Sequence, residues 1–223
     1  MKIAKISELT TNRLSIYLRC LNDLEANGQL TISSSEMARK YHLNSAQIRK
    51  DLANFGEFGR RGVGYDVRLL RDHLIKILGL DQTHRVCIVG SGRMGTALAD
   101  YYNLASPCFK VAGLFDIDKK KIGKKTGGIE ICDIKDFSAI VKRDKIEVAV
   151  IAVPAEHAQA VLDQVVEAGI KAVMNLAPVS LKADSNVKLK TVDLTRSLES
   201  LSYFLAGPTN SKKAKPSVRK RRK

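Results

Sequence analysis

Three closely spaced glycines in the middle of the chain could bind the phosphates of a nucleotide. Residues 90–95 read GSGRMG, follow an apolar run at residues 86–89 and lead into a helical segment. In GxGxxG spacing the first glycine permits a tight turn, the second admits a pyrophosphate, and the third lets the helix pack on the strand. The N–H groups at the helix start then face the phosphates. The residues expected to contact the cofactor here are Gly90, Ser91, Gly92, Arg93, Met94 and Gly95.

An acidic residue ends the next apolar segment. Residues 110–118 read KVAGLFDID and place Asp116 at 21 residues after Gly95. A carboxylate there can accept both ribose hydroxyls and repels a 2′-phosphate, which favours NAD over NADP. However, residues 119–121 are all lysine, and a basic residue nearby is the feature that accommodates NADP. We therefore predict NAD and NADH as the cofactors, with NADP left open.

Length and composition are those of a globular protein with a basic surface. The 223 residues give room for two small domains or one large one, and the formal net charge is +15. No run approaches the roughly 18 apolar residues of a membrane span, and the first residues lack the apolar core of a signal peptide. We expect a cytoplasmic protein without a membrane partner. The four cysteines are far apart and no histidine stands at metal-ligand spacing, so we predict neither a metal site nor disulfides.

The positive charge is unevenly distributed along the chain. Residues 212–223 contain eight basic and no acidic residues, and residues 1–80 contain 13 basic and 8 acidic residues. The N-terminal part is therefore expected to meet a polyanion. The tail is expected to be a disordered basic run that either adds affinity for phosphates or has no specific role.

The N-terminal part has the pattern of a helix-turn-helix. Leucines at helical spacing predict a helix over residues 7–27. Two capping patterns open further helices over residues 36–40 and 45–54. Short polar and basic side chains near the start of the last helix suit a DNA major groove. The candidate DNA-contacting residues are Ser45, Gln47, Arg49 and Lys50. The alternative is a small helical domain whose exposed face is merely charged.

A glycine-rich segment follows this last helix. Residues 54–67 contain four glycines, which is too many for a helix and suits a hairpin with a tight tip. Arg60 and Arg61 stand at that tip. A hairpin with an arginine pair beside a recognition helix is typical of the wing of a winged helix, which reaches the minor groove or its phosphates. A further helix should then end at Gly79 and lead into the second domain.

The second half of the chain alternates strand and helix patterns. Strands are predicted at residues 86–89, 110–118, 127–131, 147–153 and 170–178. With amphipathic helices between them, they predict a Rossmann-type α/β domain, a parallel sheet with helices on both faces. Ligands bind at the carboxyl ends of such strands. This rule adds the cofactor candidates Val153, Pro154, Asn175, Ala177 and Pro178. The two prolines could instead simply end strands.

The segment QIRKDLANFGEFGRRGVGYDV at residues 47–67, followed by the GSGRMG turn, resembles the Rex redox-sensing transcriptional repressors of bacteria. The resemblance covers about residues 3–207. It implies a homodimer that binds an inverted-repeat DNA operator when NADH is low and is released by NADH. The expected domains are a winged helix at residues 1–80, a Rossmann NAD(H)-binding domain at 81–190, a C-terminal helix at 191–207 and a disordered basic tail at 208–223.

Three further residues take roles from the resemblance alone. It implies that the C-terminal helix is swapped into the partner subunit, and that Asp193 pairs with Arg13 of the DNA-binding domain when NADH is bound. It also places Tyr101 near the nicotinamide in one of the two states.

Two other classes of function stay open on the residues alone. One is an NAD-dependent dehydrogenase with a helical accessory domain, and the other is a regulator that binds CoA or another nucleotide. Neither explains paired arginines on a glycine-rich wing. The four histidines are scattered and form no recognisable catalytic group. We therefore predict a sensor and not an enzyme.

Overall fold

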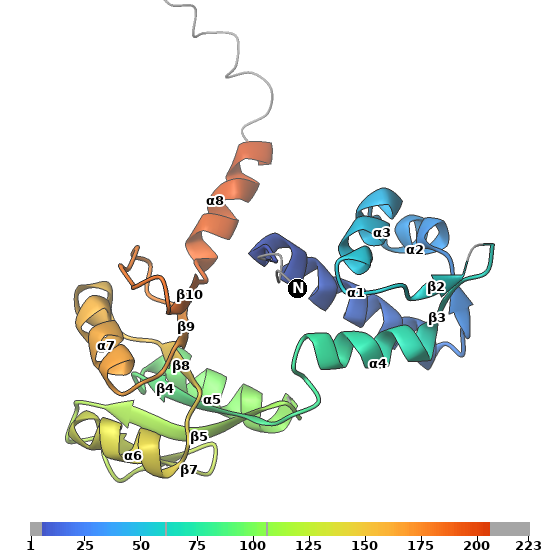
Figure 1. The fold of residues 1–223 in the computed structure, drawn as a ribbon. Helices are drawn as coiled ribbons and strands as arrows, with labels where there is room; N and C mark the ends of the chain where they lie inside the picture. The colour runs from blue at the N-terminus through green and yellow to red at the C-terminus, as the bar shows by residue number, and fades with distance from the viewer. Residues whose placement is uncertain (1–5, 61, 106, 206–223) are drawn as a thin grey trace, which may run out of the picture. The chain divides into compact units, whose positions relative to one another are not determined.

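The computed structural model describes residues 6–60, 62–105 and 107–205 of the chain. It divides the chain into two compact units, Met1–Thr83 and His84–Lys223. Buried apolar residues form separate clusters in each unit. Figure 1 shows the helices and strands of both units. Among the described residues, no helix is long and apolar enough to cross a membrane.

The first unit combines helices with a small antiparallel sheet. Its helices are α1 (Glu8–Ala26), α2 (Ser34–Tyr41), α3 (Ser45–Ala53) and α4 (Val67–Ile77). Its strands are β1 (Thr31–Ile32), β2 (Gly59–Arg60) and β3 (Gly64–Asp66), in the order β1-β3-β2 (Figure 1). The order of helices followed by a hairpin agrees with the predicted winged helix.

Local capping decides where α2 and α3 begin. The Ser33 hydroxyl accepts a hydrogen bond from the Glu36 N–H at 3.1 Å, and the Glu36 carboxylate accepts one from the Ser33 N–H at 2.8 Å. The Asn44 side chain accepts from the Gln47 N–H at 3.0 Å. These caps satisfy N–H groups that have no partner within the helix. As a result α2 begins at Ser34, two residues before the predicted start.

The leucine stripe of α1 forms the core of this unit. Leu14 and Leu21 are fully buried, and so is Ile48 on the inner face of α3. Phe55, just after α3, is only half-buried. Burying one such aliphatic side chain contributes about 1.5–3 kcal/mol. The inner face of α3 therefore fixes the helix against the core, and its outer face is left for a partner.

The hairpin of β2 and β3 packs closely against β1. Gly64 has a φ of +96°, and a Cβ at this position would lie 2.5 Å from the carbonyl oxygen of Ile32. Glycine is required here because the strands pass too close to admit a side chain. Arg60 is exposed on β2, and Arg61 lies outside the described residues.

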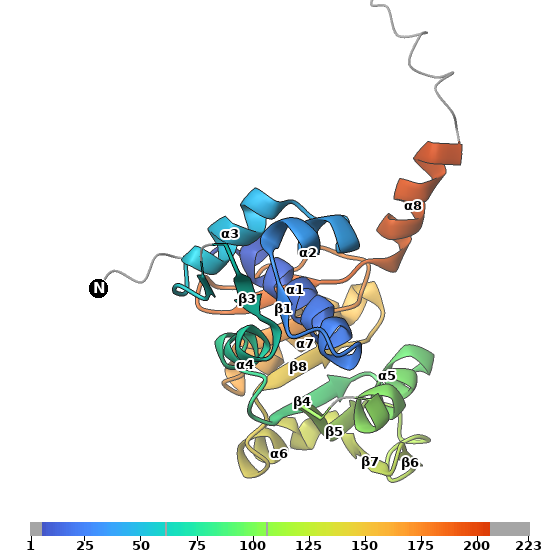
Figure 2. The same cartoon turned by 90° about the vertical axis from the view of Figure 1, so that its right-hand side faces the viewer.

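The second unit is built on a seven-stranded sheet in the order β10-β9-β8-β4-β5-β7-β6. Its strands are β4 (His84–Val89), β5 (Phe109–Asp116), β6 (Lys125–Thr126), β7 (Ile129–Asp133), β8 (Val148–Ile151), β9 (Ala172–Asn175) and β10 (Lys188–Thr191). Neighbouring strands are parallel except β6 with β7. Figure 2 shows β8, β4 and β5 side by side. The predicted parallel sheet is confirmed.

Helices cover both faces of this sheet. They are α5 (Arg93–Ala105), α6 (Phe137–Arg143) and α7 (Ala155–Glu167). On β4, Cys87 and Val89 pack in a core with α6 and α7, whereas Val86 and Ile88 pack in another with α5. Successive residues of a strand point to opposite faces, so the two cores lie on opposite sides of the sheet, as expected for an α/β domain.

Further elements differ from the sequence prediction. β7 begins two residues later than predicted, because Gly127 and Gly128 both have positive φ and turn the chain from β6 into β7. β10 was not predicted and pairs with β9 at the edge of the sheet. The final helix, α8 (Leu194–Leu205), begins three residues later than predicted, and none of its residues is buried.

Candidate functional site

The glycine turn lies at the end of the central strand β4. Gly90 has a φ of +104°, and a Cβ there would lie 2.4 Å from the carbonyl oxygen of Ala152. A Cβ at Gly95 would lie 1.9 Å from the carbonyl oxygen of Gly90. At Gly92, by contrast, a Cβ would meet nothing within 4 Å. The first and third glycines are thus required by the turn and by helix packing, and the second keeps a surface open to a ligand.

Asp116 at the end of β5 is bound to this turn. Its Oδ2 accepts hydrogen bonds from the Ser91 N–H at 2.9 Å, the Ser91 hydroxyl at 2.5 Å and the Lys121 ammonium at 2.9 Å. Its Oδ1 accepts one from the Asp118 N–H at 2.9 Å. Burial alone would raise the pKa of Asp116, but the hydrogen bonds from Ser91 and Lys121 outweigh it and lower the pKa. The carboxylate is therefore ionised at neutral pH.

A cavity of about 370 Å³ opens between the glycine turn and the segment after β8. Its walls include Gly90, Gly92, Asp116, Val153 and Pro154, all predicted cofactor contacts from three separate segments. The volume is in the range of small-molecule sites in proteins, roughly 300–1,000 Å³. The carboxyl ends of β4, β5 and β8 thus meet at one site that could hold part of a dinucleotide.

The same cavity also contains residues that the sequence analysis did not assign. Ile117 is 72% exposed and offers an apolar surface beside Asp116. His157 lines the cavity from the first turn of α7. His157 comes three residues after Pro154. The rule that ligands bind at the carboxyl ends of parallel strands could have predicted it, if the first turn of the following helix had been included.

The other residues predicted to contact the cofactor from the carboxyl ends of strands, Asn175, Ala177 and Pro178, do not line this cavity. Asn175 is fully buried, and its amide group donates to the Ala177 and Val179 carbonyls and accepts from the Ala177 N–H. These bonds shape the loop after β9. Pro178 lines a second cavity, of about 440 Å³, together with Asp193 at the start of α8. Pro178 and the loop around Ala177 remain at the carboxyl end of the sheet but outside the glycine cavity.

Three candidates lie on α5 beyond the turn. Arg93 and Met94 occupy its first turn and are exposed. Tyr101 lies two turns further along and is 61% exposed. None of the three is among the residues that line the glycine cavity in the described part of the chain.

The candidate DNA-contacting residues lie on α3 and β2. Arg49 and Lys50 are exposed, and the Arg49 guanidinium donates to the Ser34 hydroxyl at 2.8 Å. A groove of about 480 Å³ separates α3 from the wing, and both Arg49 and Arg60 line it. Ser45 is half-buried at the first position of the helix. This arrangement places basic side chains of two elements around one groove, as phosphate binding requires.

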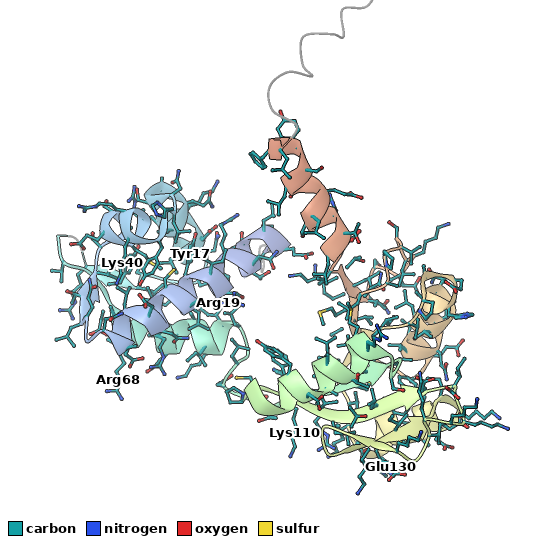
Figure 3. All side chains as sticks on the ribbon, turned by 180° about the vertical axis from the view of Figure 1, so that it is seen from behind. Tyr17, Arg19, Lys40, Arg68, Lys110 and Glu130 are labelled. Atoms are coloured by element: carbon teal, nitrogen blue, oxygen red, sulfur yellow. The ribbon has the colours of Figure 1, made fainter. Side chains whose placement is uncertain are left out.

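A buried carboxylate on α3 holds α1 and the recognition helix together. Asp51 is 1% exposed and accepts hydrogen bonds from Arg13 at 2.5 and 2.8 Å, from the Tyr17 hydroxyl at 2.9 Å and from the Gln47 amide at 2.8 Å. Tyr17, labelled in Figure 3, lies on α1. Burial favours a raised pKa for Asp51, but the bonds from Arg13, Gln47 and Tyr17 outweigh it and lower the pKa.

Sequence reasoning missed Asp51 altogether. The available signal was an acidic residue between Ile48 and Leu52 on the inner face of an otherwise basic helix. Arg13, expected to pair with Asp193, is paired here with Asp51. Asp193 instead caps α8 by accepting the Arg196 N–H at 3.1 Å.

Two family models match this chain. One, described as a CoA binding domain, matches residues 81–179, and the other, described as the N-terminus of a putative DNA-binding protein, matches residues 5–53. The first covers the glycine turn and most of the parallel sheet, and the second covers α1 to α3.

Curated relatives match almost the whole length of the chain. The redox-sensing transcriptional repressor Rex of Carboxydothermus hydrogenoformans is 45% identical over 203 residues, which are 91% of this chain and 98% of that protein. The Rex of Desulfitobacterium hafniense is 43% identical over 91% of this chain and 97% of its own length.

Solved structures of a Rex-family repressor named RSP have the same fold. RSP in complex with β-NAD⁺ and operator DNA matches with a TM-score of 0.86 at 39% identity, covering 91% of this chain and 93% of that one. RSP in complex with β-NADH matches with a TM-score of 0.82 at 37% identity, covering 91% and 95%.

Proposed function

Because this chain belongs to the Rex family of redox-sensing transcriptional repressors, we propose that it represses transcription by binding operator DNA and that NADH releases the DNA. The observation that carries this function is that one chain contains both a glycine-turn cavity and a winged helix, and that 91% of this chain aligns with such a repressor. The relatives are named as repressors, so the chain is a transcription regulator and not an enzyme. We place it in the cytoplasm, where operator DNA and pyridine nucleotides are both available.

The cofactors are NAD and NADH, and the glycine cavity is suited to hold them. The open surface at Gly92 and the N–H groups at the start of α5 would receive the pyrophosphate. Asp116 would accept the adenosine ribose, and Val153 and Pro154 would line the apolar wall of the site. The two redox states of the cofactor differ by one hydride and by the positive charge of the oxidised ring. Arg93, Met94 and Tyr101 on α5, and the loop of residues 175–178, are proposed to complete the site.

DNA binding is assigned to residues 1–80. The outer face of α3 would enter the major groove, with Gln47, Arg49 and Lys50 near base edges or phosphates. Arg60 on the wing, and Arg61 beside it in the sequence, would reach the minor groove or its phosphates. A homodimer presents two such surfaces with two-fold symmetry, which matches an inverted-repeat operator.

Arg13 connects the two activities in this proposal. Its guanidinium is held by Asp51 in the state described here, and the family resemblance implies a bond to Asp193 when NADH is bound. Arg13 would then exchange one carboxylate for the other. Asp51 also holds Gln47 on the recognition helix, so loss of Arg13 would loosen the outer face of α3. NADH can drive this exchange only if it binds the released state more tightly than the DNA-bound state.

The test is fluorescence-anisotropy binding to a labelled duplex pool enriched for inverted repeats, at fixed salt, with NADH, NAD and NADPH added in turn. We expect NADH to release bound duplex at concentrations where NAD does not. The proposal is wrong if no nucleotide affects DNA binding and if removal of residues 212–223 abolishes DNA binding. The DNA affinity would then come only from the charge of the tail.

A further inference from the structure

A serine of α2 holds an arginine of the recognition helix α3. Ser34 is 9% exposed, and its hydroxyl accepts a hydrogen bond from Nη1 of Arg49 at 2.8 Å. The two residues come from helices that lie side by side (Figure 1). This is the only hydrogen bond of the Arg49 side chain within the part of the chain that the structure describes. The position of the guanidinium therefore depends on Ser34.

The bond brings the guanidinium into the groove between α3 and the wing. Ser34 and Arg49 both line this groove, together with Tyr65 of β3. Burial raises the pKa of Tyr65, and the positive charge of Arg49 partly opposes this rise. The guanidinium thus lies near both α2 and β3. Among the described residues that line the groove, Arg49 and Arg60 are the cations and Glu57 is the only carboxylate, so the groove is basic.

The place of Ser34 in the fold indicates which part of the DNA this guanidinium would meet. In a helix-turn-helix the second helix enters the major groove, and the first helix crosses the DNA backbone. Ser34 is the first residue of α2, which is the first of these two helices. A guanidinium bound there lies where the backbone passes. The bond to Ser34 uses one N–H donor of Arg49 and leaves the others for a bidentate contact with a phosphate.

We propose that Ser34 is a positioning residue, which holds the Arg49 guanidinium in the groove so that it binds a phosphate of the DNA backbone. This inference rests on the proposed DNA-binding function. A long side chain loses conformational freedom when a partner immobilises it, and this loss weakens binding. Ser34 restricts Arg49 before the DNA arrives. Removal of its hydroxyl should therefore weaken DNA binding although the positive charge remains.

The next serine provides a matched control. Ser35→Ala makes the same chemical change one residue later on α2. Ser35 is exposed, and it is not among the residues that line the groove. The capping box of α2 is formed by Ser33 and Glu36, so neither Ser34→Ala nor Ser35→Ala removes it. Urea unfolding of both variants checks that the fold is kept.

The experiment measures DNA affinity of the full-length protein by fluorescence anisotropy, with NAD present, between about 50 and 200 mM salt. The probes are an inverted-repeat duplex selected by the wild-type protein and an unrelated duplex of the same length. Ser34→Ala should weaken binding to both duplexes by the same factor, about threefold to tenfold per subunit, with an unchanged salt dependence. Ser35→Ala should change either affinity by less than about twofold.

Arg49→Gln shows whether Ser34 acts through Arg49. Loss of one phosphate contact should lower the slope of log affinity against log salt by about one per subunit. In the Arg49→Gln background, Ser34→Ala should change the affinity by less than about twofold, because the side chain that it positions is already gone. A serine that merely stabilised α2 would have the same effect in both backgrounds.

The outcomes separate this inference from the proposed function. If NADH releases the wild-type protein from the inverted repeat but Ser34→Ala binds as wild type does, the inference is wrong and the repressor function stands. The inference is also wrong if Ser34→Ala weakens binding equally with and without Arg49. A loss confined to the inverted repeat would assign Arg49 to base edges and overturn the phosphate contact. If the wild-type protein binds neither duplex, the proposed function itself fails.

Discussion

At the scale of single residues, the three glycines of the turn differ in what a side chain would meet. Gly95 faces a backbone oxygen at a distance that no Cβ tolerates, whereas Gly92 faces open space and has no left-handed φ. The fold therefore requires a glycine at position 95. At position 92 the fold would accept a side chain, so a ligand is the reason for a glycine there.

This difference gives a matched pair of variants. Gly95→Ala should push α5 away from β4, cost about 1–3 kcal/mol in the free energy of unfolding and abolish NADH binding. Gly92→Ala should leave the free energy of unfolding within about 0.5 kcal/mol of wild type, yet weaken NADH binding because its methyl group fills the surface that the pyrophosphate approaches. Chemical unfolding and calorimetric titration of both variants measure the two effects. Normal NADH affinity in Gly92→Ala would contradict the proposed placement of the pyrophosphate.

The Asp51 carboxylate predicts a loss of stability in acid. Its pKa is lowered from the usual 3.8, so the unfolded chain takes up this proton at a higher pH than the folded chain does. The stabilisation is therefore complete above about pH 5 and is lost as the pH falls through 3.8 and then through the lower pKa of the folded state. Urea unfolding at a series of pH values should show this decline in wild type.

Asp51→Asn tests the assignment of that decline. Removing one member of this partly exposed pair should cost about 2 kcal/mol at neutral pH, less than for a fully buried pair, and should make the acid decline shallower. Glu57→Gln, which removes an exposed carboxylate of the same unit, is the control and should follow the wild-type curve. An equal decline in Asp51→Asn and wild type would assign it to other carboxylates.

The sequence was sufficient for some of these residues and not for others. Gly90, Gly92 and Asp116 could be predicted because a local motif fixes their chemistry at fixed spacing. Asp51 could not, because its role depends on Arg13, which lies 38 residues earlier in the chain. Nothing within α3 itself indicates that partner.

At the scale of elements, prediction succeeded where periodicity was strong and failed at an edge of the sheet. The helix α1 and the buried strands β4 and β8 have long apolar patterns, and capping side chains mark where α2 and α3 start. β10 is a short edge strand with alternating lysines and only one half-buried residue. Its strand conformation comes from pairing with β9, which a single segment of sequence does not reveal.

Helix α8 carries an apolar stripe that its own unit leaves uncovered. Leu194, Leu198, Leu201 and Leu205 are between 57% and 88% exposed. Exposed apolar stripes of this kind are typical of protein interfaces. The family resemblance implies that a second copy of the chain covers it, in a homodimer.

Leu198→Glu combined with Leu201→Glu should therefore convert the dimer to a monomer and weaken binding to an inverted repeat, because two linked half-sites become one. The measurement is the molar mass by light scattering after gel filtration. Ser200→Glu adds one negative charge on another side of α8 and should remain dimeric. A dimer that survives the double substitution would show that α8 does not form the interface.

At the scale of the whole molecule, the basic residues fall into two groups, one suited to sequence-specific DNA binding and the other to non-specific DNA binding. The wing and α3 supply basic side chains on a folded surface, whereas residues 212–223 add eight basic residues with no acidic ones. A run of basic residues without acidic ones binds phosphates irrespective of base sequence.

Replacing those eight basic residues by glutamine, which keeps the length of the chain, should lower affinity for operator and unrelated duplexes by the same factor. It should also make the dependence of affinity on salt less steep. Anisotropy titrations of both duplexes between about 50 and 200 mM salt measure the slope. A loss confined to the operator would instead assign the tail a role in base recognition.

The junction between β10 and α8 makes the helix a lever. Only Val192 and Asp193 separate the two elements, and the Val192 N–H is bound to the Asn175 carbonyl at 2.8 Å. The base of α8 is thus attached to the loop at the carboxyl end of β9. A helix of 12 residues is about 18 Å long, so a slight tilt at its base moves Leu205 by several ångströms. A small displacement of the loop after β9 would therefore produce a larger displacement of the C-terminal end of α8.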